Sequence, residues 1–301
     1  MRDSLADATR CTKPFPRRAM TPWLFVAALG AGFVQALPAM AEAIPAPTMS
    51  IPQAALNSSF TWGLSAGLDY ATGTYGAKCA LKVTGLNCST TGTTLIALPL
   101  TAMLQVDRLR LQATVPYVDI EGPGKFAGDI GIPVIIGPAA TDRSHRSGLG
   151  DMSFGAAWIL ARETTFWPTL EIAGIVKLPT ATNGLGTGKS DYGAQLNLYR
   201  GLLPGLTAFG SLGYQWIGEV KSVTLESGAK ATAGLDWNLR LISLGATLDY
   251  RQHSWSGAPD YFALNPYLTW HMIGGIAVSV YGTVGLTRAS PGSGAGVRVS
   301  L

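Results

Sequence analysis

Charged side chains recur within segments of this chain that alternate between apolar and polar residues. Arg110, Glu171, Lys177, Asp249 and Arg251 stand in such segments. Successive side chains of an extended strand point to opposite faces, so these residues share the face opposite the apolar one. Two interpretations stay open: a charge-lined pathway that selects solutes, or ion pairs that hold a narrow barrel closed. We expect these five mid-strand or toward the outer half of the strands. The same face is predicted to carry Asp69, Arg108, Asp151, Asp191, Lys230, Asp236 and Arg298.

Catalytic chemistry has weak support in the sequence. A lipid-hydrolysing barrel needs a Ser–His pair with an orienting acid or amide, and the chain has three histidines. His145 falls in the longest predicted loop and His271 at a predicted turn. His253 and Ser254 are adjacent, so in a strand they would point to opposite faces. We therefore expect no catalytic set.

Cofactor and metal sites are not expected either. The segment 184–192, GLGTGKSDY, looks like a phosphate-binding loop, but Asn183 stands at the first glycine position. A predicted strand rather than a helix follows, so no helix N-terminus would hold phosphate. A flexible outer loop is the better interpretation. Cys79 and Cys88 have no histidine beside or between them, which favours one disulfide over a metal pair.

The alternation that positions these residues runs from Phe60 to Leu301. It predicts twelve strands, most near the 9–11 residues that a tilted strand needs to cross a bilayer. Short connections alternate with long ones, as in outer-membrane barrels, and an even count places both ends in the periplasm. The expected fold is a twelve-stranded antiparallel up-and-down barrel, with ten strands as the alternative count. The predicted strands are 60–70, 93–105, 108–119, 150–160, 168–179, 190–200, 206–217, 229–239, 242–252, 261–270, 275–286 and 292–301.

Aromatic residues on the apolar face fall near both ends of the predicted strands. Amphipathic rings favour the two membrane interfaces, whereas a soluble sandwich has no need of rings at both ends. The predicted rings are Trp62, Trp158, Trp237 and Trp270 at one end, and Tyr70, Tyr117, Tyr192, Tyr214, Trp216, Tyr250 and Phe262 at the other.

The predicted loop 120–149 is open to two interpretations. It could be a segment folded inward as a constriction, or a surface loop that contacts lipopolysaccharide through Arg143 and Arg146.

The N-terminal segment has the features of export. Basic residues precede an apolar stretch, and Ala39-Met40-Ala41 closes it with small residues, so residues 1–41 are predicted to be a signal peptide. Residues 42–59 are predicted to form a proline-containing periplasmic extension, and 60–301 the barrel. Without residues 1–41 the chain keeps 17 basic and 16 acidic residues, a net charge of +1. No basic cluster remains that would indicate nucleic-acid binding.

Several short motifs occur here in one order. They are Val115-Pro116-Tyr117, Gly148-Leu149-Gly150-Asp151, Lys177-Leu178-Pro179-Thr180, 186–192 (GTGKSDY) and 214–218 (YQWIG). Together, over roughly 93–270, they resemble the outer-membrane transporter family associated with phenol degradation through the MetA pathway. The resemblance implies a channel for small compounds, aromatic or hydrophobic ones among them. Cys79 and Cys88 have no place in the family pattern.

The chain end resembles the signal that outer-membrane assembly machinery reads. Gly296, Val299 and Leu301 take the expected positions, although the final residue is usually aromatic. The sequence therefore predicts a channel for passive uptake in the outer membrane of a Gram-negative bacterium. Its predicted partners are outer-membrane lipid, lipopolysaccharide, the assembly machinery and small solutes, without a cofactor. The alternative is a structural or adhesive barrel with a plugged lumen, whose loops bind partners.

Overall fold

The computed structural model describes residues 60–73, 92–123, 125–129, 132–136, 143–218, 225–253 and 259–301. The predicted signal peptide 1–41, the extension 42–59 and the predicted disulfide between Cys79 and Cys88 lie outside these ranges. Across the described ranges, no helix is long and apolar enough to cross a membrane.

Fifteen strands make up the regular structure of the described residues. Thirteen of them form one sheet, and β4 and β5 pair separately as a hairpin. The strands are β1 Phe60–Gly73, β2 Thr93–Val106, β3 Leu109–Pro123, β4 Lys125–Asp129, β5 Ile132–Ile136, β6 Arg143–Leu149, β7 Ser153–Ala161, β8 Thr169–Lys177, β9 Asp191–Leu203, β10 Leu206–Trp216, β11 Gly228–Asn238, β12 Ile242–Arg251, β13 Tyr261–His271, β14 Ala277–Gly285 and β15 Ser293–Ser300.

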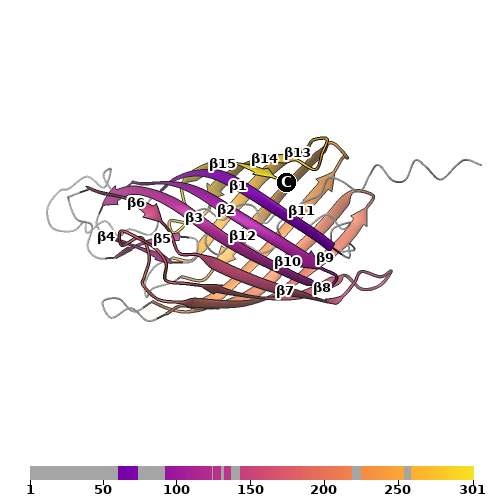
Figure 1. The fold of residues 1–301 in the computed structure, drawn as a ribbon, viewed down its shortest axis with the longest axis horizontal. Coiled ribbons are helices and arrows are strands. Elements are labelled where there is room, and N and C mark those ends of the chain that lie inside the picture. Colours follow the sequence, from indigo (N-terminus) through magenta and orange to yellow (C-terminus); the bar gives the residue numbers. More distant parts are fainter. Residues whose placement is uncertain are drawn as a thin grey trace, which may run out of the picture.

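The sheet closes on itself as a barrel (Figure 1). Each strand is antiparallel to its neighbours. β1 pairs with β2 and also with β15, so the first and last strands of the sequence meet and close the barrel. β6 and β7 pair with successive parts of β3, so they form one strand of the wall, interrupted at 150–152. The wall is therefore twelve strands around. This confirms the predicted fold, and each predicted strand overlaps an observed one.

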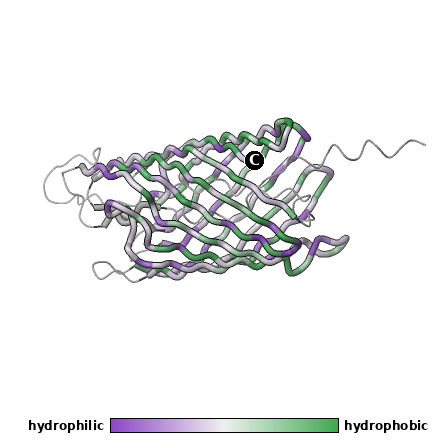
Figure 2. The backbone as a smooth tube through the Cα atoms, viewed as in Figure 1, coloured by the Kyte–Doolittle hydropathy of each residue, from purple (hydrophilic) through white to green (hydrophobic). Residues whose placement is uncertain are grey.

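The two faces of the wall differ in chemistry, as the alternation requires. On β2, Leu100 is 58% exposed to the outside, whereas its neighbour Thr101 is 4% exposed and faces inward. The same alternation of burial runs along β1, β2 and β13. Figure 2 shows hydrophilic and hydrophobic residues interspersed along the strands. Apolar side chains outside and hydrogen-bonding side chains inside are the arrangement of a barrel in lipid.

Aromatic side chains mark both ends of the outer wall. Near the short turns, Trp62, Trp158, Trp237 and Trp270 are about half exposed. Near the long loops, the rings of Tyr214 and Trp216 meet edge to face at 5.1 Å. Rings in these two zones suit the two interfaces of a bilayer. Tyr70, Tyr117 and Tyr192 also face outward toward the long-loop end.

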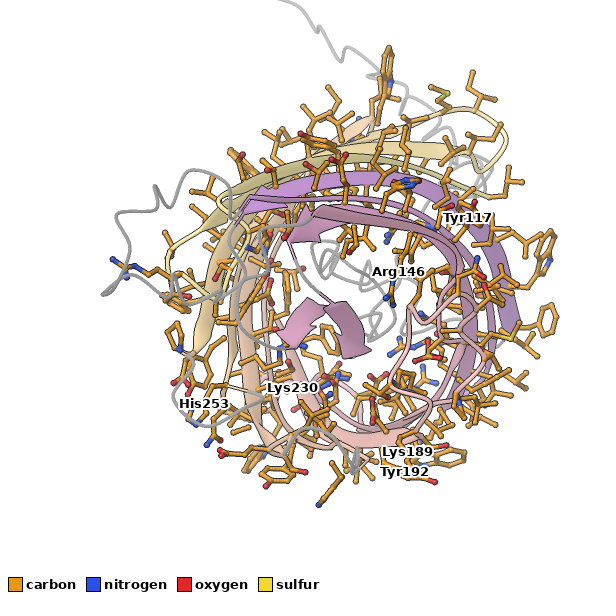
Figure 3. The ribbon with its side chains drawn as sticks, turned by 90° about the vertical axis from the view of Figure 1, so that its left-hand side faces the viewer. Tyr117, Arg146, Lys189, Tyr192, Lys230 and His253 are labelled. Atoms are coloured by element: carbon orange, nitrogen blue, oxygen red, sulfur yellow. The ribbon has the colours of Figure 1, made fainter. Side chains whose placement is uncertain are left out.

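The predicted loop 120–149 proves to be mostly strand. β3 continues to Pro123, and β6 pairs with it, so that Glu121 lies opposite His145. The prediction that His145 lies in a loop is therefore wrong: it is a strand residue whose Nε2 lies 2.9 Å from Asp119 Oδ2. The remaining connection carries the β4–β5 hairpin. Looking into the barrel from this end, Figure 3 shows the ribbon of the hairpin within the outline of the ring.

Candidate functional site

The barrel interior holds the candidate site residues in separate clusters. The first joins Arg110 to Glu171, where Arg110 Nη2 donates to both carboxylate oxygens at 2.6 Å. Asn197 Nδ2 donates to Glu171 Oε1 at 2.7 Å. The Arg110 and Glu171 side chains are 2% and 1% exposed. The charge-assisted bonds offset part of the cost of removing water from both groups.

The position of this first pair differs from the expectation. Arg110 is the second residue of β3 and Glu171 the third of β8, and both strands begin at short turns. The pair therefore lies toward the short-turn end, not mid-strand or in the outer half. The register explains why two residues 61 positions apart meet: β7 lies between β3 and β8, and inward side chains reach across it.

The second cluster surrounds Lys177 near the long-loop end. Its Nζ lies 2.7 Å from Asp191 Oδ2 and 3.0 Å from Asp151 Oδ2. Lys177 ends β8, and Asp191 begins β9 directly opposite it. Asp151 comes from the interruption between β6 and β7. Two carboxylates thus hold one ammonium, and all three side chains are almost fully buried.

The segment 178–190 is fixed onto the inner side of this cluster. Met152 N donates to Thr180 Oγ1 at 2.8 Å, and Ala181 N donates to Asp151 Oδ1 at 2.9 Å. Arg146, which Figure 3 shows inside the ring, donates to Gly184 O at 3.0 Å. The segment therefore lies at the long-loop end, as expected of an outer loop, but these hydrogen bonds anchor it to the barrel. The motifs at 148–151, 177–180 and 186–192 meet here and form one anchored unit.

The third cluster contains Asp249. Its carboxylate accepts hydrogen bonds from Thr232 Oγ1 at 2.6 Å, Thr247 Oγ1 at 2.9 Å and Asn265 Nδ2 at 2.6 Å. Neutral donors stabilise this buried charge, and none of the three bonds comes from Arg251. Arg251 instead places its guanidinium carbon 5.4 Å from the centre of the Tyr261 ring.

Two of the other carboxylates predicted to face inward are hydrogen-bonded to tyrosines. Asp69 accepts a hydrogen bond from Tyr281, and Asp236 accepts one from Tyr267 at 2.8 Å. Arg108 does not face inward, because it lies exposed at the turn after β2 and donates to backbone carbonyls. Its assignment to the inner face is therefore wrong. A turn residue has no fixed place in the alternation of the strands beside it.

Two histidines make contacts that sequence reasoning missed. His271 is a buried residue of β13, and its Nε2 lies 2.8 Å from Ser243 Oγ. Its Nδ1 has no hydrogen-bond partner within the described ranges, so no acid orients this pair. The pairing depends on the register of β12 with β13, which no local motif encodes.

His253 links two segments at the long-loop rim. Its Nδ1 lies 2.7 Å from Asp260 Oδ1, and its Nε2 lies 3.3 Å from Glu226 Oε2. The hydrogen bond with Asp260 raises the pKa of His253 above its ordinary value. The same bond lowers the pKa of Asp260. Ser254 lies outside the described ranges.

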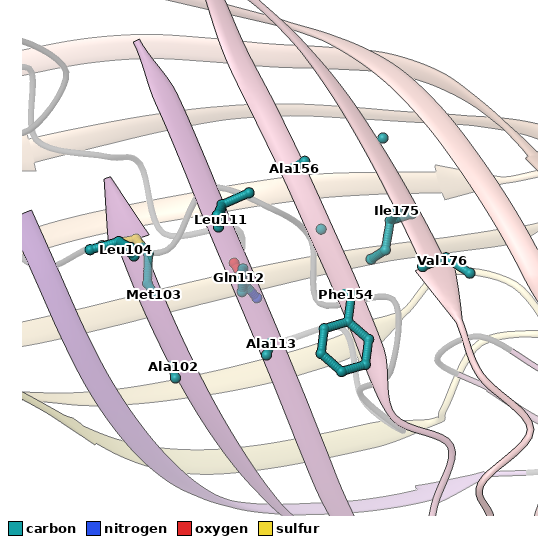
Figure 4. Close-up of a pocket in the computed structure, with 12 residues that line it drawn as sticks. Ala102, Met103, Leu104, Leu111, Gln112, Ala113, Phe154, Ala156, Ile175 and Val176 are labelled. Carbon is teal, nitrogen blue, oxygen red and sulfur yellow. The ribbon is translucent and has the colours of Figure 1, made fainter. Parts of the chain in front are cut away.

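An apolar hollow of about 560 Å³ crosses β2, β3, β7 and β8 (Figure 4). Small outward residues, among them Ala102 and Ala156, leave space that Leu104 and Phe154 border. Gln112 is the one hydrogen-bonding side chain of its lining. The hollow therefore suits hydrocarbon rather than a polar ligand.

Comparison with known proteins places the chain among outer-membrane barrels. A family described as "Putative MetA-pathway of phenol degradation" matches residues 100–301. No curated protein matches the chain. An outer-membrane channel from Pseudomonas putida F1 is 13% identical with a TM-score of 0.57, covering 79% of this chain and 94% of that one. At this identity the likeness concerns the fold.

Two further solved structures are less similar. The toluene transporter TodX of P. putida is 12% identical with a TM-score of 0.38, covering 89% of this chain and 98% of that one. The outer-membrane phospholipase A of Escherichia coli is 11% identical with a TM-score of 0.39, covering 79% and 95%.

Proposed function

Because this chain belongs to the family of the MetA pathway of phenol degradation, we propose that it is an outer-membrane channel for the passive uptake of small molecules. The observation that carries the proposal is a closed barrel whose inner face holds many hydrogen-bonding and charged side chains while its outer face suits lipid. A barrel that served only as an anchor would have no need of so many hydrogen-bonding groups inside. The long-loop end would face the cell exterior, in contact with lipopolysaccharide.

The interior chemistry supports small aromatic solutes. Buried rings of Tyr199, Phe209, Tyr261, Tyr267 and Tyr281 lie on the inner face. Hydroxyl and amide side chains lie between them, such as those of Thr101, Thr114, Gln195 and Asn265. Rings favour stacking against an aromatic solute, and hydroxyl or amide groups can exchange hydrogen bonds with its polar substituent. Arg110, Glu171, Lys177, Asp249 and Arg251 would set the charge preference of the path.

A plugged structural or adhesive barrel is the second candidate, favoured by one observation. The segment 178–190 is anchored inside the mouth, and the buried pairs Arg110–Glu171 and Lys177–Asp191 occupy the inner face. In a plugged barrel these pairs would hold the structure together and no solute would pass.

Liposome swelling distinguishes the two candidates. We expect liposomes that contain the purified protein to admit 4-hydroxybenzoate faster than empty liposomes, and faster than a sugar of similar mass. Lys177→Gln should change the ratio of anion to cation entry, whereas Arg162→Gln on the short-turn rim should not. Entry no faster than into empty liposomes, with a folded protein, would reject the channel. Equal entry of the sugar would reject the aromatic preference alone.

A further inference from the structure

Lys230 carries a buried ammonium group that the described residues leave without a hydrogen-bond acceptor. It is the third residue of β11, near the long-loop end, and Figure 3 shows it on the inner side of the ring. The side chain as a whole is half-buried, but its Nζ has no exposed surface and no hydrogen bond. An ammonium removed from water normally gains a carboxylate or several acceptors in exchange.

The inner wall fixes the position of this ammonium. Gly213 lies opposite Lys230 on β10, and a Cβ atom there would come within 2.9 Å of Lys230 Cε. The aliphatic part of the Lys230 side chain therefore lies over the inner face of β10, at a position where β10 has no side chain. A larger residue at position 213 would displace the ammonium.

The neighbour on the other side is also a cation. Arg251 lies opposite Lys230 on β12, with its guanidinium beside the Tyr261 ring. The next inward residue along β12, Asp249, directs its carboxylate to three neutral donors. No ion pair joins Lys230 to an acid within the described ranges, and Arg251 adds a second cationic side chain beside it.

Lys177 provides a direct contrast with Lys230. Both lysines lie on the inner face near the long-loop end, and both ammonium groups are buried. Lys177 is held by Asp151 and Asp191 at 3.0 and 2.7 Å. Among the described residues Lys230 has no such carboxylate, although its desolvation calls for one.

We propose that Lys230 and Arg251 form a binding site for the carboxylate of a small aromatic acid. A carboxylate offers two acceptor oxygens, one for each cation, and neutralises their repulsion. The Tyr261 ring gives the aromatic body of the ligand a surface beside the charge. This inference rests on the proposed channel function, because the acid would be a solute held on its way through the lumen.

The test measures benzoate binding to the purified, folded, full-length protein in detergent by isothermal titration calorimetry. We expect saturable binding to the wild type, at least tenfold weaker binding to Lys230→Met, and unchanged binding to Lys189→Met. Lys189 is the matched control because its side chain is exposed at the loop. Benzyl alcohol, which lacks the carboxylate, should bind the wild type at least tenfold more weakly than benzoate.

Three results would overturn the site: no benzoate binding to the folded wild type, equal binding to Lys230→Met, or displacement of benzoate by chloride at equal concentration. If Lys230→Met does not fold, the wild-type titrations with benzoate, benzyl alcohol and chloride still decide the matter. Conductance of the same preparation separates this inference from the channel. A conducting protein that ignores benzoate would refute the site alone, and a protein that binds benzoate without conducting would refute the channel alone.

Discussion

Replacing Glu171 with glutamine would leave the Arg110 guanidinium without its carboxylate. The side chain of Arg110 is 2% exposed, and Glu171 is its ion-pair partner at 2.6 Å. Removal of one partner from a buried pair typically costs about 3–5 kcal/mol, because the other charge stays desolvated. With a urea m value of about 2 kcal/mol/M, the unfolding midpoint would fall by roughly 1.5–2.5 M.

The assay is equilibrium unfolding of the reconstituted protein in urea, followed by tryptophan fluorescence. Arg162→Gln is the matched control, because Arg162 pairs with Asp107 at a similar distance of 2.8 Å but with side chains 30% and 67% exposed. Exposed pairs contribute at most about 1 kcal/mol. The double variant Arg110→Met/Glu171→Met should recover most of the loss. A Glu171→Gln midpoint equal to that of Arg162→Gln would refute the reasoning.

Three other changes test separate parts of the structure. Leu100→Arg places a charge midway along the lipid-facing side of β2. It should destabilise the protein in bilayers by about 2–4 kcal/mol, more than the same change at an exposed rim position. Equal effects at the two positions would contradict the assignment of the outer face. Gly245→Val would displace the Tyr267 ring, which lies against the glycine, and should cost about 1–3 kcal/mol of unfolding free energy in urea titrations; an unchanged midpoint would argue against that packing. The pKa of His253 is raised, so its contact with Asp260 contributes below the ordinary histidine pKa and is lost as pH rises through the raised value. His253→Gln should therefore lower the urea midpoint at pH 5.5 but not at pH 9, and a loss equal at both pH values would count against this contact.

The fold could be predicted because the alternation of side chains between the two faces of a strand is visible within each segment of the sequence. Each strand of a barrel carries its own alternation, so positions such as Leu100 and Thr101 could be assigned to opposite faces without knowledge of their partners. The segment 143–149 was not predicted to be a strand, because its mostly polar residues do not alternate with apolar ones. Its strand conformation comes from pairing with the extended end of β3.

The site could be predicted as a set of inward residues but not as a set of contacts. Contacts between inward side chains depend on the stagger of the strands around the barrel, which no single segment encodes. Arg110 meets Glu171 across an intervening strand, and Ser243 meets His271 through the β12–β13 register. The ammonium of Lys230, which has no hydrogen-bond partner in the part of the chain that the structure describes, could not be predicted either, because its surroundings depend on all neighbouring strands.

Single-channel recording in planar bilayers tests the central claim most directly. The purified wild-type protein should produce discrete conductance steps, and Lys177→Gln should shift their reversal potential in a salt gradient relative to Arg162→Gln. Such steps would match a polar path through a closed barrel. A folded, inserted protein that never conducts would contradict the channel and favour the plugged barrel.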